Sequence, residues 1–262
     1  MLPLSPRFPA ALLSRIEDAG LNASAPPQQR WIDGWLVRYC PGKAKRARCI
    51  NAVAEGRLPL ADRHAAAAAV FREAGLPLFY RLTPFTRPDG LDDWLVGQGM
   101  HLIDDTRVMV TTEVPASAEA LPGTVTLARA APAEFAEIVG ALRGSPPEQR
   151  SAHAERMAQS PVPYQGWIVR QRDSGEAVAC GQTASEGDMV GVYDVYTHPD
   201  HRGRGLARQL CSTLLAGARA AGARVAYLQV DAANAPARAI YHRLGFADAY
   251  GYHYRTPDAD AH

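Results

Sequence analysis

The chain has 262 residues, with 28 Lys and Arg against 27 Asp and Glu, a formal net charge of +1 and 47% hydrophobic residues. This length is enough for one large domain or two modest ones, each with a buried core. The nearly neutral charge excludes a global field that recruits nucleic acid or an anionic membrane, so any contact with a polyanion must be local.

The cysteines and the apolar runs predict the compartment. Four cysteines lie far apart: Cys40, Cys49, Cys180 and Cys211. They form no C-x-x-C pair, which fits neither a zinc site nor a disulfide framework. The short apolar start is broken by Pro9, unlike a signal peptide, and the longest apolar run, Ala65 to Phe71, is too short to span a membrane. We therefore expect buried, reduced thiols in a cytoplasmic protein without a membrane partner.

The first 120 residues predict a basic loop followed by alternating helices and strands. The patch PGKAKRAR, Pro41 to Arg48, is typical of a solvated loop. The expected elements are a helix from Ala61 to Ala74, a strand from Phe79 to Leu82, a helix from Leu91 to Val96 and a strand from Val108 to Val114. The segment from Glu113 to Val125 is rich in proline and small residues, as loops between domains often are. It predicts two domains, 1–120 and 121–262.

The second part predicts an antiparallel meander followed by helices and strands in alternation. Leu206, Leu210 and Leu214 recur at i, i+4 and i+8, and Gly222 is placed as a C-terminal stop, which predicts a helix from Gly205. The other expected elements are strands at Val125 to Leu127, Trp167 to Arg170, Ala177 to Thr183, Met189 to Thr197, Val225 to Val230 and Ala249 to Arg255, with helices at Ala133 to Leu142, Ala152 to Ala158 and Ala235 to Leu244. The last helix is opened by Asn234 and closed by Gly245.

The order helix, strand, helix, strand occurs in both parts of the chain. It runs from Ala61 to Val114 and again from Gly205 to Arg255. Short α/β units resemble one another by chance, so a divergent internal duplication is a hypothesis that a structure can test.

The stretch THPDHRGRGLARQL, residues 197–210, carries the strongest chemical signal. A helix N-terminus exposes unpaired N–H groups and a partial positive charge, which together attract phosphate. Gly203 and Gly205 permit positive φ and remove Cβ atoms, Ala207 keeps the first turn slim, and Arg202 and Arg204 can add charge-assisted bonds. No dinucleotide or P-loop fingerprint is present. A pyrophosphate ligand explains this costly start, although a plain turn with a helix cap remains the simpler alternative.

Four segments in one order resemble the GNAT superfamily of acetyl-CoA-dependent N-acetyltransferases. They are VYDVYTHP, RGRGLARQL with its R-x-x-G-x-[GA] pattern, VAYLQV and the N-x-x-A-x-x-I-Y-x-x-L-G-F segment from Asn234 to Phe246. The resemblance covers residues 124–255. It implies an α/β fold with a mixed, largely antiparallel sheet flanked by helices, together with a degenerate GNAT-like N-terminal half. That half has only Gly56 in INAVAEGRLPLA, so we expect it to bind no pyrophosphate and to cover the substrate side or stabilise the fold.

The resemblance also implies a role for particular residues. Residues 202–207 would hold the diphosphate of acetyl-CoA, a bulge in the preceding strand would pair with pantetheine, and Tyr241 would be the general acid. The implied cofactor-binding residues are Val195, Tyr196, Thr197, Arg202, Gly203, Arg204, Gly205, Leu206, Ala207, Asn234, Ala237 and Tyr241. The N–H of Tyr196, or of a neighbour at the bulge, could stabilise the oxyanion. A phenol with a reference pKa of about 10 can protonate the leaving thiolate.

Asp194 is the candidate for the general base or for an ammonium anchor. A reference pKa of about 3.9 makes it a poor direct base, so burial would have to raise the pKa or a water would have to relay the proton. Structural alternatives stand beside these roles. Tyr241 could be a core aromatic residue, Asn234 a helix cap, and Asp194 a hydrogen-bonding carboxylate. His198 and His201 lack acidic neighbours suited to a metal, and no metal is expected.

The sequence therefore predicts acetyl transfer from acetyl-CoA to a primary amine by direct attack through a tetrahedral intermediate. The rival function is a non-catalytic acyl-CoA-binding or regulatory module. A nucleic-acid role for the RGRG segment is disfavoured by the nearly neutral charge. A small metabolite, a peptide N-terminus, a lysine side chain and an antibiotic all stay open as acceptors, and so does a homodimer.

Overall fold

The computed structural model describes residues 2–260, and the strands of this part of the chain form one eleven-stranded sheet. Their order is β1-β2-β3-β4-β11-β5-β10-β9-β8-β7-β6. The first part of the chain contributes α1 (Ala10–Ala23), β1 (Gln29–Ile32), β2 (Trp35–Arg38), β3 (Ile50–Ala52), α2 (Leu60–Glu73), β4 (Tyr80–Leu82), α3 (Leu91–Gly97) and β5 (His101–Thr111). The second contributes β6 (Val125–Ala130), α4 (Pro132–Leu142), α5 (Pro147–Ala158), β7 (Tyr164–Gln171), β8 (Ala177–Glu186), β9 (Met189–Thr197), α6 (Leu206–Ala220), β10 (Val225–Asp231), α7 (Ala235–Arg243) and β11 (Ala247–Thr256).

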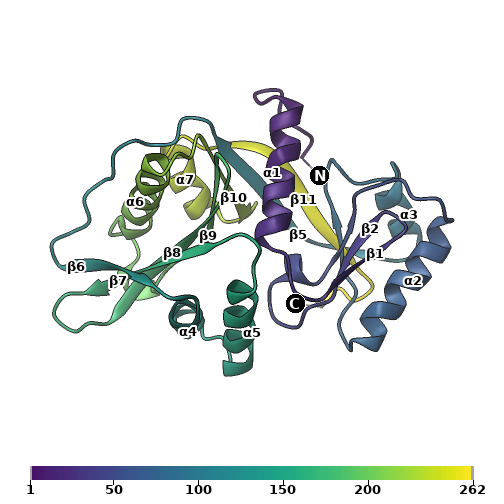
Figure 1. Ribbon diagram of the computed structural model, residues 1–262, viewed down its shortest axis with the longest axis horizontal. Coiled ribbons are helices and arrows are strands. Elements are labelled where there is room, and N and C mark those ends of the chain that lie inside the picture. Colours follow the sequence, from purple (N-terminus) through teal and green to yellow (C-terminus); the bar gives the residue numbers. More distant parts are fainter. Residues whose placement is uncertain (1, 261–262) are drawn as a thin grey trace.

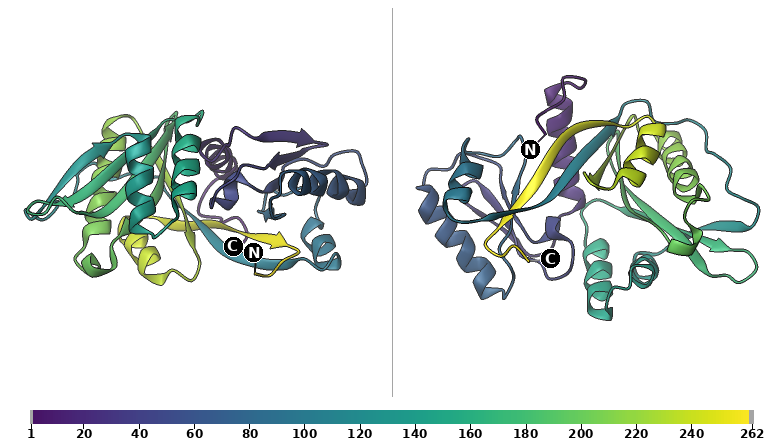
Figure 2. Two further views of the ribbon diagram at one scale, coloured as in Figure 1. Left: turned by 90° about the horizontal axis from the view of Figure 1, so that it is seen from below. Right: turned by 180° about the vertical axis from the view of Figure 1, so that it is seen from behind.

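The elements gather into two lobes joined by two long strands. Helices α2 and α3 belong to one lobe and α4 to α7 to the other, while β5 and β11 run between them (Figures 1 and 2). The expected meander is confirmed, because β6, β7, β8 and β9 pair in sequence and antiparallel. The expected mixed sheet is confirmed too, since β9 pairs with β10, and β3 with β4, in parallel.

Most predicted helices lie within one or two residues of their expected bounds, and the differences have physical causes. Helix α5 begins at Pro147 instead of Ala152, because a proline at the first position of a helix costs no hydrogen bond. Strand β5 covers His101–Thr111 and not Val108 to Val114, because its polar first half is held by pairing with β11. The β1–β2 hairpin was not predicted, although Asp33 and Gly34, both at positive φ, form the Asp-Gly turn that favours hairpins.

Strands β5 and β11 are exchanged between the two parts of the chain. β5, from the first part, pairs along β10 of the second, and β11, from the second part, pairs with β4 of the first. The two exchanged strands also pair with each other at the centre of the sheet. The connections β3-α2-β4-α3-β5 and β9-α6-β10-α7-β11 therefore follow one topology, and neither part completes its sheet alone.

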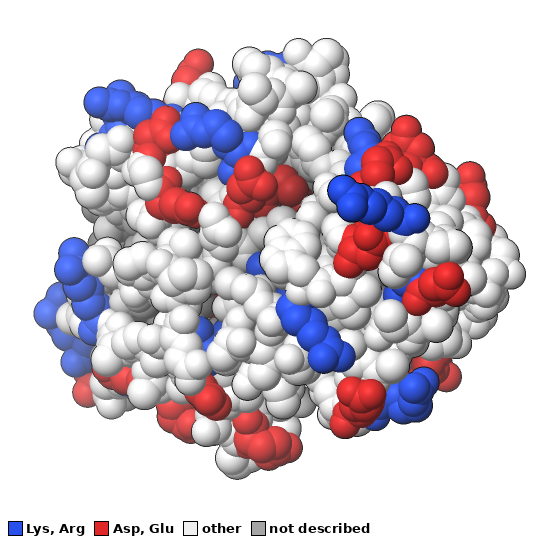
Figure 3. Space-filling view, turned by 45° about the vertical axis from the view of Figure 1, so that its right-hand side comes forward, with Lys and Arg blue, Asp and Glu red and all other residues white. Residues whose placement is uncertain are grey.

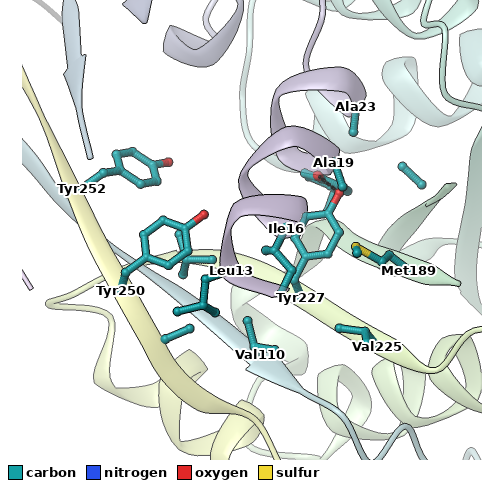
Figure 4. Close-up of a cluster of buried hydrophobic side chains, with 14 of the residues drawn as sticks. Leu13, Ile16, Ala19, Ala23, Val110, Met189, Val225, Tyr227, Tyr250 and Tyr252 are labelled. Carbon is teal, nitrogen blue, oxygen red and sulfur yellow. Dashed lines mark hydrogen bonds between the residues drawn. The ribbon is translucent and has the colours of Figure 1, made fainter. Parts of the chain in front are cut away.

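Helix α1 packs over this central junction. Leu13, Ile16, Ala19 and Ala23 are fully buried or nearly so, and they face Val110, Tyr227 and Tyr250 of the central strands (Figure 4). The helix is also held by a buried ion pair. Glu17 accepts hydrogen bonds from Arg81 of β4 and, at 2.7 Å, from the Tyr250 hydroxyl of β11. Burial alone would raise the pKa of Glu17, but the charge of Arg81 outweighs it and keeps the pKa below its usual value.

All four cysteines are free and buried, as expected. Within residues 2–260, no helix has both the length and the apolar character needed to cross a membrane.

Candidate functional site

The site begins where two parallel strands part. β9 and β10 pair only over Met189–Val192 and Val225–Leu228. Beyond these residues, β10 follows its other neighbour, β5, as far as Asp231, whereas β9 follows β8 to Thr197. The facing edges of the two strands are therefore without strand partners in the described chain. Such an edge can pair with an extended ligand as another strand would.

A bulge in β9 produces this divergence, as the family resemblance of the sequence implies. The register against β8 passes from Tyr193 opposite Gln182 to Tyr196 opposite Cys180, which leaves one extra residue on β9. Asp194, at φ 50, adopts the left-handed conformation at this point. A bulge of this kind bends the strand and increases its twist, so the end of β9 turns away from β10.

The loop after β9 presents a row of free backbone amides. Gly203 and Gly205 have φ of 76° and 79°, and α6 begins directly after them at Leu206. Within residues 2–260, the N–H groups of residues 203–208 donate to no acceptor, and the first turn of α6 holds no acidic side chain. A Cβ atom on Gly203 would meet nothing within 4 Å, so this side of the loop is open. Free amides at a helix N-terminus are suited to an anion such as a phosphate.

The two arginines of the loop support its shape. Arg202 Nε donates to Thr197 O at 3.2 Å, and its guanidinium lies 5.6 Å from the ring centre of Tyr196. Arg204 Nη2 donates to Asp200 O at 3.0 Å. Each arginine therefore stabilises the loop through a carbonyl and retains further N–H groups that can bind an anion.

Tyr241 and Asn234 lie on α7, the helix that follows β10. Asn234 caps this helix, since its Oδ1 accepts from the N–H of Ala237 at 3.2 Å, as the sequence predicted. Tyr241 is buried beside Cys211 and Phe246, yet its hydroxyl has no hydrogen-bond partner among the described residues. Burial raises the pKa of Tyr241 above its ordinary value, and Cys211 adds to the shift. The phenol is therefore protonated at neutral pH.

Asp194 does not meet the condition for a direct base. Its carboxylate accepts from Arg143 at 2.8 Å and from Gln182 at 2.6 Å, and His153 Nε2 lies 3.4 Å away. Burial alone would raise the pKa of Asp194, but the contact with His153 and the charge of Arg143 hold it well below its usual range. The structure thus contradicts the raised pKa that Asp194 would need as a direct base. Its two basic partners come from the end of α4 and from α5, so the sequence around Asp194 does not reveal them.

The backbone of Tyr196 also has a partner. Burial raises the pKa of the Cys180 thiol to about 12, while a hydrogen bond from the Tyr196 backbone acts to lower it. This contact directs the Tyr196 amide toward β8. Another amide at the bulge then becomes the better candidate for binding an oxyanion.

A cavity of about 320 Å³ lies beside the bulge, between α4, α5 and the basic loop of the first part of the chain. Asp194, Tyr193 and Tyr164 line it from the sheet, and His153 lines it from α5. Arg46 reaches it from the short 3-10 turn Lys45–Ala47. The expectation of a merely solvated loop at Pro41 to Arg48 was therefore wrong. Arg46, Arg143 and His153 come from segments that lie far from Tyr193 and Asp194 in the sequence, so no local pattern indicates that they line the same cavity.

The corresponding turn of the first part of the chain holds a carboxylate of its own. Between β3 and α2, the amides of Arg57 and Leu58 both donate to Asp33 Oδ2 at 2.7 Å. The bond from Leu58, and after it the bond from Arg57, lowers the pKa of Asp33. The turn at Gly56 is packed against Asp33, whereas Gly203 is open. The amides that would face a phosphate here are already bound.

The two histidines near the loop have local partners. His198 Nδ1 accepts from the Asp200 N–H at 3.3 Å, and His201 Nδ1 lies 3.2 Å from Gln171 Nε2. In the part of the chain that the structure describes, no group of three His, Cys, Asp or Glu side chains could hold a metal ion.

Comparison with known proteins agrees with this architecture. Residues 133–246 match the model of the Acetyltransferase (GNAT) family. The chain is 25% identical over 239 residues to the uncharacterized N-acetyltransferase YobR of Bacillus subtilis, covering 87% of this chain and 91% of that protein. A shorter match, 41% identical over 54 residues, covers 21% of this chain and 32% of the L-methionine sulfoximine/L-methionine sulfone acetyltransferase of Salmonella typhimurium.

The fold agrees as well. The solved GCN5-related N-acetyltransferase from Kribbella flavida superposes with a TM-score of 0.66 at 21% identity, covering 94% of this chain and 96% of that one. The splayed strands, the open glycine loop and these similarities lead to one conclusion: residues 133–246 form a GNAT-family domain, the chain has the GNAT fold, and it is an acyltransferase enzyme.

Proposed function

We propose that the chain transfers an acetyl group from acetyl-CoA to a primary amine by direct attack through a tetrahedral intermediate. The observation that carries the proposal is the row of free amides at residues 203–208, directly beside the parted strands. The row fits a diphosphate, and the free edge of β9 fits the extended arm that carries a thioester. The match to the methionine sulfoximine acetyltransferase covers too little of this chain to name the acceptor.

The acetyl-CoA is proposed to bind along one continuous surface. Its diphosphate would lie on residues 202–207 and its pantetheine along Val195, Tyr196 and Thr197. Asn234 and Ala237, at the start of α7, would contact the arm from the side of β10. The amide of Asn234 keeps a free NH₂ group for this contact, because only its oxygen is used in the helix cap.

The chemistry is then divided among few groups. The amine nitrogen forms a bond to the thioester carbon, the C–S bond breaks, and the sulfur takes the proton of the Tyr241 hydroxyl. Amides at the bulge would stabilise the oxyanion. The free hydroxyl and the raised pKa of Tyr241 suit this donor role. The proton of the entering amine would leave through solvent in the cavity beside the bulge.

Asp194 is proposed as a positioning residue and not as the base. Its carboxylate holds Arg143 and Gln182 by hydrogen bonds and lies against His153, so it fixes the wall of the cavity next to the bulge. An ammonium group of the acceptor could approach the same carboxylate before it loses its proton.

The first part of the chain is proposed to be a divergent GNAT-like half, with domains 1–120 and 121–262. Its support is the shared topology and the reciprocal exchange of β5 and β11. Because Asp33 binds the amides of Arg57 and Leu58, this half is proposed to bind no CoA and to cover the acceptor cavity instead.

The enzyme is proposed to act in the cytoplasm, where the free thiols would stay reduced.

The acceptor is proposed to be a small molecule or a peptide amine, with no nucleic-acid partner. The net charge of +1 supports this, and lysines and arginines alternate with acidic residues on the face drawn in Figure 3.

We predict that Tyr241→Phe slows acetyl transfer by roughly a hundredfold, because the thiolate then leaves without its proton donor. Release of free thiol from acetyl-CoA, followed with a panel of amines, measures the effect. Tyr39→Phe, which removes a hydroxyl outside the site, should leave the rate unchanged. Equal rates for the two variants would remove Tyr241 from the mechanism. CoA binding without thiol release from any amine would favour the non-catalytic binding module.

We predict that Gly205→Val weakens CoA binding by roughly tenfold or more, because a β-branched residue at positive φ strains the loop and narrows it. Titration calorimetry with CoA measures the change. The control is Gly75→Val at the end of α2, where a glycine also has positive φ, 63°, and a Cβ atom would meet nothing within 4 Å. The control should lose similar stability yet bind CoA normally. Equal affinity in both variants would exclude the loop as the phosphate site.

We predict that Asp194→Asn lowers activity by the same factor at every pH from about 6 to about 9. Because folding lowers the pKa of Asp194, its carboxylate is fully ionised above the ordinary value of 3.8 and takes up a proton only as the pH falls below that value. Its interactions with its basic partners are therefore the same throughout the tested range. Turnover measured across this range tests the prediction, and Asp188→Asn, at an exposed turn, is the control. A loss of turnover that grows toward pH 6 would restore the titrating role.

A further inference from the structure

The cavity beside the bulge, called the acceptor cavity because the acceptor amine is proposed to bind there, is lined by more basic than acidic side chains. Its lining contains one carboxylate, that of Asp194. The basic groups of the lining are Lys43, Arg46, Arg143, Arg150, Arg156 and His153. Two of them are neutralised, because Arg143 pairs with Asp194 at 2.8 Å and Arg150 pairs with Glu137 at 2.6 Å. The charges of Lys43, Arg46 and Arg156 give the cavity a positive character.

Arg46 is one of these charges, and its contacts are with aromatic side chains and not with a carboxylate. Its guanidinium lies 5.9 Å from the ring centre of Tyr193 and 3.5 Å from the Tyr252 hydroxyl, and its Nε atom is buried without a partner. Within residues 2–260 it makes no ion pair with a carboxylate. Withdrawing a cation from water is costly unless an anion compensates for it. The anion is therefore expected from outside the chain.

Arg156 acts on the same part of the cavity from the opposite domain. Arg156, Arg46 and Tyr164 all line this cavity, and the Tyr164 hydroxyl donates to Ala23 O at 2.6 Å. Burial raises the pKa of Tyr164, whereas the charges of Arg156 and Arg46 act to lower it. Arg156, like Arg46, forms no ion pair within the described residues. Two guanidinium groups that form no ion pair within the described residues, one from each proposed domain, therefore line the same cavity.

We propose that the acceptor amine carries an anionic group, a carboxylate or a phosphate, that binds between Arg46 and Arg156 while the amine is directed toward Asp194 at the bulge. The inference rests on the proposed acetyl transfer at the same site. Guanidinium groups bind carboxylate and phosphate with charge-assisted, often bidentate, hydrogen bonds. Polyamines and aminoglycosides are disfavoured, because their charges would be repelled by the unpaired arginines. The first domain thereby acquires a role, since it supplies one of the two anion-binding side chains.

Matched pairs of amines test the proposal directly. Glycine, leucine and glutamate would each be compared with their amides, phosphoethanolamine with ethanolamine, and spermidine would stand for cationic amines. We expect kcat/KM to be roughly tenfold or more higher for the anionic member of at least one pair. A preference confined to the amino acids identifies a carboxylate, and one confined to phosphoethanolamine identifies a phosphate. Equal or better turnover of every neutral or cationic amine overturns the proposal.

Two variants locate the effect. Arg46→Gln and Arg156→Gln should each raise KM for the preferred anionic amine by roughly tenfold, with little change in kcat and none in KM for its neutral partner. Arg72→Gln, on the exposed surface of α2, is the control and should change neither value. If Arg46→Gln does not fold, Arg156→Gln still tests the site. Equal effects on the anionic amine and its neutral partner would contradict it.

Calorimetry on the CoA-saturated protein separates this inference from the acetyl transfer itself. Binding of an anionic amine that Arg156→Gln weakens, without thiol release from acetyl-CoA, would disprove the transfer and support the anion site. Transfer to neutral amines alone would support the reaction and disprove the anion site. The absence of both binding and turnover with every anionic amine would overturn the inference.

Discussion

Strands β9 and β10 share hydrogen bonds over four residues and then part, because each follows a different neighbour. The bulge at Asp194 turns β9 toward β8, and β5 holds β10 on the opposite side. This divergence leaves two edges inside the sheet that have no strand partner among residues 2–260. Open edges are normally a liability that proteins cover. Here they lie next to an open glycine loop, and the most economical explanation is that a ligand completes the sheet.

The pairing of β10 with β5 also connects the two parts of the chain. The first part of the chain contributes β5, which pairs with β10 of the second part. The second part contributes β11, which pairs with β4 of the first. The exchange brings the basic loop at residues 41–48 over the cavity beside the bulge. The turn that corresponds to the glycine loop is closed by Asp33, whose carboxylate takes the place that a phosphate could occupy. One topology thus contains one turn whose amides are free among the described residues and one turn whose amides are bound to a carboxylate.

The sequence predicted the elements whose signals are local. The leucine period of α6, the cap at Asn234 and the Gly203 and Gly205 pair all depend on neighbours within a few residues, and each lies where it was expected. The site lining could not be predicted in this way. Arg46 is 147 positions from Tyr193, and its position is fixed by packing between the lobes. The lowered pKa of Asp194 likewise comes from His153 on α5 and from Arg143 at the C-terminal cap of α4.

A crystal structure of the protein with bound CoA would locate the ligand directly. We expect the diphosphate to lie within hydrogen-bonding distance of the backbone amides of residues 203–208, with the pantetheine arm between β9 and β10. A diphosphate bound instead between β3 and β4, or on the basic loop at residues 41–48, would contradict it.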